Sequence, residues 1–67
     1  MIKQIIGENA GQIWQLLNKN GEMQLAELLK NSNIEEADFN MSLGWLAREG
    51  KIATYDKDDK QMVLLIY

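Results

Sequence analysis

The part of the sequence that most constrains the fold is residues 25–52, where two short apolar helices are expected on either side of a tight polar turn. Leu25, Leu28 and Leu29 are spaced i, i+3 and i+4, so they form one apolar stripe along a first helix. Residues 31–33 are Asn-Ser-Asn, which favour turns and caps over helix interiors. The pattern therefore predicts a helix that stops near residue 31 and a turn that leads directly into another helix.

The second helix is predicted over residues 34–49. We expect Asn33 to cap its N-terminus, with Glu36 reaching back as in a capping box. Gly50 should end it in a left-handed conformation. At about 100° per residue, one face of this helix gathers three large apolar side chains: Phe39, Leu43 and Leu46.

The flanking segments complete a recognisable order of elements. A helix is predicted over residues 7–18 and a short strand over 23–25, both before the two helices. Afterwards, residues 51–55 and 62–67 should form a hairpin with 56–61 as its tip. This order predicts an α+β winged helix-turn-helix, with three helices, a small antiparallel sheet and a C-terminal β-hairpin wing, as a single domain of residues 1–67. Its expected core positions are Leu25, Ala26, Leu28, Ile34, Phe39, Leu43, Leu46 and Ile52.

The composition excludes several kinds of chemistry. The chain has no cysteine and no histidine, so disulfides, thiolate metal sites and the Ser-His-Asp and Cys-His forms of catalysis are excluded. Zinc is not expected where carboxylates are the remaining side-chain ligands, and no carboxylates stand in a catalytic spacing. We therefore expect no enzyme, no cofactor and no small-molecule ligand. No apolar run approaches the ~20 residues of a membrane span, and polar residues at 4 and 7–9 interrupt the start too early for a signal peptide. A cytoplasmic protein is expected.

Two motifs and one core segment resemble a family of small bacterial winged helix-turn-helix proteins of unknown function. The segments are Gly-Glu-Asn-Ala-Gly at 7–11 followed by Trp14, residues 25–29, and Leu-Gly-Trp-Leu-Ala-Arg-Glu at 43–49 followed by Lys-Ile at 51–52. The last of these is the most specific. The resemblance covers nearly the whole chain and implies the fold, but it supplies no activity and no functional residue.

The charges argue against nucleic acid as the ligand. Seven basic against ten acidic residues give a net charge of −3, whereas DNA affinity comes mainly from Lys and Arg that neutralise phosphates. In a DNA-reading winged helix, the exposed side of the second helix enters the major groove. Here those positions are Glu35, Glu36, Asp38, Asn40, Met41, Gly44 and Trp45. The three carboxylates also suit the N-terminus of a helix whatever the function, but they would repel phosphates.

DNA binding remains as an alternative that would use the 34–49 helix and the 56–61 wing. Among the helix positions, Asn40 has the chemistry of a base reader. Lys51, Lys57 and Lys60 could contact the backbone, although each wing lysine stands beside an aspartate. The other interpretation of these lysines is that they are solvated surface charges.

The apolar side chains in excess of a core say more about function than the charges do. Met41 and Trp45 lie roughly opposite the core face of the second helix, and Gly7, Gly11 and Trp14 form a side stripe on the first helix. Two glycines in such a stripe allow the close approach of another backbone. The last strand, residues 62–67, is apolar on both faces, although a small wing sheet normally covers one.

Two interpretations of this surplus compete. In the first, the tryptophans complete one compact core, and residues 1–6 cover the outer face of the last strand. The sequence leaves those six residues open as a strand, a helix lead-in or an arm. In the second, the surplus is a protein interface through Trp45, Met41, Trp14 and Gly11. We favour the interface, because exposed apolar patches mark association sites and tryptophan and methionine concentrate in them. A homodimer is its simplest form, and the last strand could also pair edge to edge.

Overall fold

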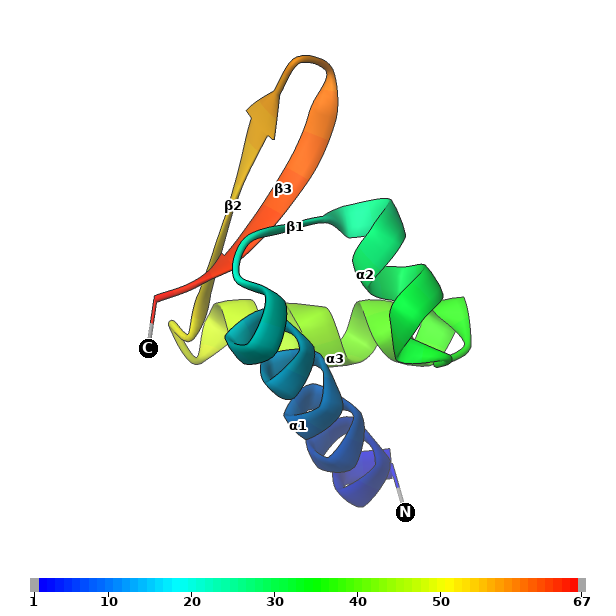
Figure 1. The fold of residues 1–67 in the computed structure, drawn as a ribbon. Coiled ribbons are helices and arrows are strands. Elements are labelled where there is room, and N and C mark those ends of the chain that lie inside the picture. The colour runs from blue at the N-terminus through cyan, green and yellow to red at the C-terminus, as the bar shows by residue number, and fades with distance from the viewer. Residues whose placement is uncertain (1, 67) are drawn as a thin grey trace.

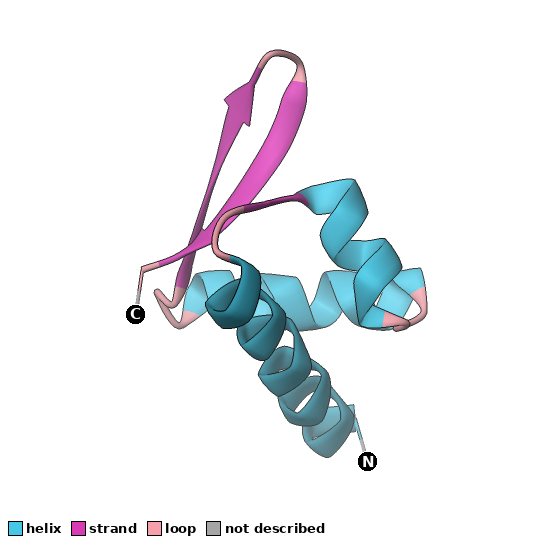
Figure 2. Ribbon diagram, in the orientation of Figure 1, coloured by secondary structure: helices cyan, strands magenta, loops and turns pink. Residues whose placement is uncertain are grey.

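The computed structural model describes residues 2–66, and it contains three helices and a three-stranded antiparallel sheet (Figure 1). The elements in chain order are α1 (Ile2–Asn20), β1 (Met23–Gln24), α2 (Leu25–Ser32), α3 (Glu36–Arg48), β2 (Ile52–Lys57) and β3 (Lys60–Leu65). In Figure 2, α1 and α3 lie below the sheet, α2 lies beside it, and the β2–β3 hairpin extends away from the helices as a wing.

Helix α1 is longer than the sequence pattern predicts. It begins at Ile2, so residues 2–6 are its first turns and not a strand or an arm. Figure 1 shows this end of α1 pointing away from the hairpin. The idea that residues 1–6 cover the outer face of the last strand is therefore wrong for residues 2–6, and Met1 lies outside the described residues. At the other end, Gly21 adopts a positive φ of 78° and its N–H donates to the Leu17 carbonyl oxygen at 2.8 Å, which closes the helix.

The turn between α2 and α3 uses different residues from those expected. Asn33 is the left-handed C-cap of α2, with φ 58°, and the N-cap of α3 is Glu35, which makes no side-chain capping bond. The predicted capping box is therefore wrong. Ser32 performs the capping: its buried Oγ donates to the Leu29 carbonyl oxygen at 2.7 Å and accepts from the Ile34 N–H at 3.2 Å. A left-handed Asn33 cannot also hold the extended conformation of an N-cap.

Helix α3 ends as predicted. Gly50 has a φ of 71°, and its N–H donates to the Ala47 carbonyl oxygen at 3.1 Å. The Lys51 N–H donates to the Leu46 carbonyl oxygen at 3.0 Å. These two bonds satisfy carbonyls that the helix end would otherwise leave without an internal donor, and they direct the chain into β2.

The sheet has the order β1-β3-β2, with β3 in the middle. Val63 lies opposite both Met23 and Thr54, so β3 is already paired on both sides there. The edges of the sheet are β2 and the short β1, and the expectation that the last strand pairs edge to edge is wrong for the part of β3 that is paired on both sides. The wing tip is also tighter than predicted. The turn consists of Asp58 and Asp59, both at positive φ (51° and 64°), as in a type I′ turn.

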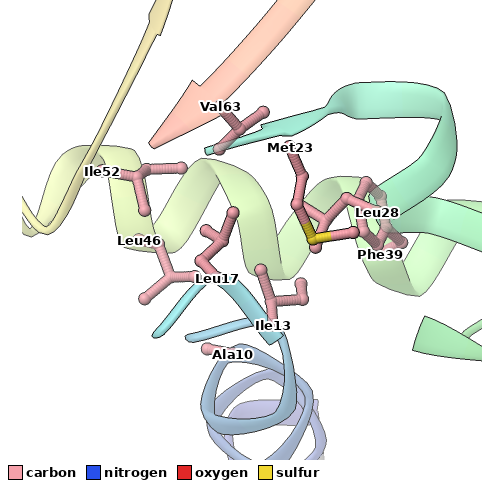
Figure 3. Close-up of a cluster of buried hydrophobic side chains, with 9 residues drawn as sticks. All are labelled: Ala10, Ile13, Leu17, Met23, Leu28, Phe39, Leu46, Ile52 and Val63. Carbon is pink, nitrogen blue, oxygen red and sulfur yellow. The ribbon is translucent and has the colours of Figure 1, made fainter. Parts of the chain in front are cut away.

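The core lies between α1, α3 and the inner face of the sheet (Figure 3). Its buried side chains are Ala10, Ile13, Leu17, Met23, Leu28, Phe39, Leu46, Ile52 and Val63. Leu25, Ile34 and Leu43 are half-buried against this cluster, as core positions should be. Ala26 is exposed, so its assignment to the core is wrong: Leu25 and Leu28 lie on the inward side of α2, and position 26 turns toward solvent.

Candidate interaction surface

A groove open to solvent runs between α1 and α3. Its volume is about 220 Å³, and its lining is almost entirely apolar or small. The lining residues are Gly7, Ala10, Gly11, Trp14, Trp45, Leu46 and Lys51. Ala10 and Leu46 belong to the core and form the floor, so the groove leads directly from the surface to the packed interior.

Helix α1 supplies one wall of the groove through residues on one flank. Gly7, Gly11 and Trp14 follow each other at spacings of four and three, which keeps them together along a helix. A Cβ built on either glycine would meet no heavy atom within 4 Å. The fold of the single chain therefore gives no packing reason for glycine at these two positions, although each glycine in a helix interior costs about 1 kcal/mol relative to alanine.

Helix α3 supplies the other wall. Trp45 is 44% exposed, and Met41, one turn earlier on the same side, is 47% exposed. The side of α3 that carries Phe39, Ser42 and Leu46 is buried, and it lies about 110° around the helix from Met41 and Trp45. An exposed tryptophan and methionine so close together on one helix are unusual for a chain this small, because large apolar side chains are normally used to fill the core.

One partly buried hydrogen bond connects the two helices that form the walls. Ser42 is 0% exposed, and its Oγ donates to the Ile6 carbonyl oxygen of α1 at 3.2 Å. The bond joins residues 36 positions apart and lies between the two helices. It fixes α1 against α3 and so helps to determine the position of the groove. Ser42 does not stand out in the sequence, since its only signal is a small polar residue on an otherwise apolar helix face.

The structure brings together three of the four residues predicted for an interface. Trp14, Gly11 and Trp45 line the same groove, and Met41 lies one turn from it on α3. We call these four residues, together with Gly7, the tryptophan face. Lys51 also lines the groove, although the sequence suggested it as a DNA contact.

The residues suggested for DNA binding do not gather in one place. Asn40 is exposed on α3, and Lys51 lies in the groove beside Trp45. Lys57 and Lys60 face each other across the wing turn. Both wing lysines line a second hollow of about 330 Å³ that also contains Glu22, Glu27 and Asp58 among its lining residues. Three carboxylates therefore accompany the two wing lysines.

A hydrogen bond connects the wing to the segment before β1. Glu22 accepts it from the Tyr55 hydroxyl, and this bond is the main reason that the pKa of Tyr55 is raised above its ordinary value of 10.0. Some desolvation and the negative charge of Glu22 raise the pKa further. The bond lies on the outer side of the sheet, where Tyr55, Met62 and Gln24 form one row across the three strands.

The outer face of the sheet is also partly apolar. Met62 and Leu64 are half-buried there, and Ile66, just after β3, is 53% exposed. This agrees with a last strand that is apolar on both faces. Tyr67 lies outside the described residues.

Other kinds of site are not evident in the described part of the chain. Within residues 2–66, no helix is long and apolar enough to cross a membrane. Among the same residues, no three carboxylates form a group that could hold a metal ion. A third hollow, of about 290 Å³, lies between α1 and α2 and is lined mainly by polar side chains such as Gln12, Gln15 and Asn31.

Comparisons with known proteins agree with this description. The family model described as "Winged helix-turn-helix domain (DUF2582)" matches residues 1–65. The uncharacterized protein MJ1608 of Methanocaldococcus jannaschii is 46% identical over 66 residues, covering 88% of this chain and 86% of that protein. The solution NMR structure of protein BT2368 from Bacteroides thetaiotaomicron has a TM-score of 0.83 at 32% identity, covering 97% of this chain and 79% of the other. The resemblance and the winged helix-turn-helix fold inferred from the sequence are thus confirmed, and the chain belongs to the DUF2582 family of winged helix-turn-helix domains.

Proposed function

We propose that this chain is a non-enzymatic, cytoplasmic protein-interaction module, and that the tryptophan face is its binding surface. A homodimer is the simplest form of such an interaction. The observation that carries the proposal is the convergence of Trp14, Gly11 and Trp45 on one groove, with Met41 exposed beside it. Trp14 is half-buried, whereas α3 presents Trp45 and Met41 to solvent, where a solitary domain would gain more by burying them.

The exposed area of the chain supports the proposal. Its accessible surface is 4778 Å², whereas a compact monomer of 7.7 kDa is expected to expose about 4,300 Å². The excess is about half of the ~800 Å² that each partner buries in a stable interface of standard size. The molecule also measures 38 × 22 × 19 Å, so it is elongated for its size.

The charges near the start of α3 also favour protein over nucleic acid. Glu35 and Glu36 are exposed and Asp38 is half-buried, all at the end of the helix that would enter the major groove. Phosphates would meet these carboxylates before any cation of α3. A protein surface imposes no such penalty, because the partner can carry either sign of charge.

Light scattering at micromolar concentration tests the proposal. We expect a mass above the 7.7 kDa of one chain, and we expect Trp45→Ala to reduce it. The matched control is Ile5→Ala, since Ile5 is 46% exposed and lies about 200° around α1 from Gly7. A monomeric wild-type chain whose behaviour Trp45→Ala leaves unchanged would remove the homodimer.

DNA binding is the second candidate. It is favoured by the short wing, which carries Lys57 and Lys60 on either side of its turn. Asn40 on α3 is also exposed. This function predicts retention on immobilised duplex DNA that weakens as salt rises. Absence of retention at low salt would count against it.

A further inference from the structure

We propose that the partner of the tryptophan face is a second copy of this chain, and that two α3 helices pair antiparallel through their exposed sides, about a two-fold axis at the level of residue 43. This inference rests on the proposed function and adds the partner and the geometry to it. It follows from the order of charged, apolar and small residues along the exposed side of α3.

The charges on α3 are divided between its ends. Glu36 and Asp38 lie in the first turn, Arg48 lies in the last turn, and Glu49 follows it as the C-cap. A parallel pair would place like charges together at both ends. An antiparallel pair places the acidic first turn of each helix beside Arg48 of the other, away from the other acidic first turn, and the two-fold symmetry repeats this contact.

The spacing of the residues fixes the register of this pair. If the axis passes at residue 43, Asp38 lies opposite Arg48 of the other copy, and Met41 lies opposite Trp45. At a rise of about 1.5 Å per residue, the ion pairs lie ~7.5 Å from the axis and the Met–Trp contacts ~3 Å from it. The apolar contacts are thus central and the ion pairs peripheral, which is the usual arrangement in protein interfaces.

Gly44 lies beside the axis and makes the close approach possible. It is exposed in the middle of α3, and a Cβ built on it would meet no heavy atom within 4 Å. Nothing in the single chain requires glycine there. In the pair, the absent side chain lets the two helices approach at the 8–10 Å separation of packed helices, with the partner's Met41 thioether against the Trp45 indole.

This arrangement would cover the side of α3 that reads DNA in other winged helices. Asn40 lies one residue before Met41 and would be at the margin of the contact. Pairing of two chains and entry of α3 into a major groove would then exclude each other. The acidic first turn of α3, which opposes phosphate binding, becomes one half of the attraction between copies.

Charge reversal tests the register. Arg48→Glu places like charges together at two symmetric points, so we expect the dissociation constant of the dimer to rise about ten-fold at low salt. Asp38→Lys should have a similar effect. The double variant Asp38→Lys/Arg48→Glu restores both pairs and should return the dissociation constant to within about three-fold of the wild-type value. Lys60→Glu on the wing is the control, because it changes the net charge by as much as Arg48→Glu does.

Crosslinking gives a second test that does not depend on charge. The chain has no cysteine, so Gly44→Cys introduces a single thiol near the proposed axis. Mild oxidation should convert most of this variant to a covalent dimer, because two α-carbons within about 7 Å can be bridged. Lys30→Cys on α2 should remain mainly uncrosslinked under the same conditions.

The outcomes separate this inference from the proposed function. If the charge-reversed single variants dimerise like the wild type, or the double variant is weaker than either, the antiparallel register is overturned. The same holds if Lys30→Cys crosslinks as readily as Gly44→Cys. A dimer that Trp45→Ala nevertheless disrupts would leave the proposed function standing. A wild-type chain that is monomeric at tens of micromolar overturns both the register and the homodimer.

Discussion

At the scale of single residues, the turn of the helix-turn-helix depends on Ser32. Its hydroxyl accepts from the N–H of the half-buried Ile34 and donates to the Leu29 carbonyl oxygen, so Ser32→Ala leaves the Ile34 N–H without that partner. We expect a loss of about 1–3 kcal/mol in the free energy of unfolding, measured by urea denaturation. Asn33→Gly is the control: glycine accepts the left-handed conformation, so stability should change little. Equal losses from both variants would contradict this account of the turn.

Tyr55 gives the fold a dependence on alkaline pH. Because its pKa is raised in the folded chain, the hydrogen bond to Glu22 contributes fully below the ordinary tyrosine pKa. That contribution is lost as the pH rises through the folded pKa. We therefore expect the wild-type chain to lose stability relative to Tyr55→Phe as the pH is raised above about 10.

The phenolate absorbance near 295 nm measures the same pKa directly. In the Tyr67→Phe background Tyr55 is the one remaining tyrosine, and it should titrate above 10. Adding Glu22→Gln removes the negative charge and weakens the acceptor, so the pKa should move down toward its ordinary value. A titration that Glu22→Gln does not shift would contradict the assigned cause.

Single residues were also where prediction from the sequence was weakest. Residues 31–33 predict a turn, but three polar residues in a row do not determine which of them caps which helix. Asn33 was expected to cap α3, yet it ends α2 and Ser32 supplies the hydrogen bonds. Ser42 was not identified either, because a bond to a residue 36 positions away leaves no trace in local periodicity.

At the scale of elements, the two glycines of α1 are expected to lower the stability of the isolated domain and to strengthen the proposed dimer. Gly7→Ala and Gly11→Ala add a methyl group that meets nothing within 4 Å. Each should therefore stabilise the isolated domain by about 1 kcal/mol through helix propensity. If the tryptophan face binds a second chain, the same methyl groups should weaken the dimer.

The comparison is made by measuring thermal unfolding and self-association on the same samples. Thermal unfolding at high dilution reports the monomer, and sedimentation at micromolar concentration reports the dimer. Gln12→Ala is the control, as an exposed position on α1 outside the groove lining. Variants that gain stability and dimerise as well as the wild type would show that the glycines are not needed for association.

The helices and strands themselves follow well from the sequence, because periodicity and turn residues determine them locally. The i, i+3, i+4 pattern of α2 and the Gly50 terminus of α3 both appear in the structure. The errors are at boundaries. The first helix extends back to Ile2, because Ile6 and Ile2 continue the apolar stripe of Ala10 toward the N-terminus at spacings of four residues. The wing turn shrinks to Asp58-Asp59, because aspartate tolerates the positive φ that a two-residue turn needs.

At the scale of the whole molecule, the sequence predicted the fold and the gathering of Trp14, Gly11 and Trp45 in one place. Helical spacing put Gly11 and Trp14 on one stripe, and the fold brought that stripe beside Trp45. The sequence could not predict the groove itself, because its shape depends on how α1 crosses α3. It also could not predict that Lys51 lies in the groove and not on the wing side. Such placements arise from tertiary packing and have no local signature.

We propose that the exposed side of α3 binds protein and not nucleic acid, and the indole N–H resonance of Trp45 in heteronuclear NMR distinguishes these two kinds of partner. The chain has two tryptophans, so the resonance is assigned with Trp14→Phe. We predict that the Trp45 signal shifts as the protein is diluted from millimolar to low micromolar concentration, and that adding duplex DNA at low salt leaves it in place. A Trp45 chemical shift that does not change on dilution but changes on addition of DNA would contradict this proposal.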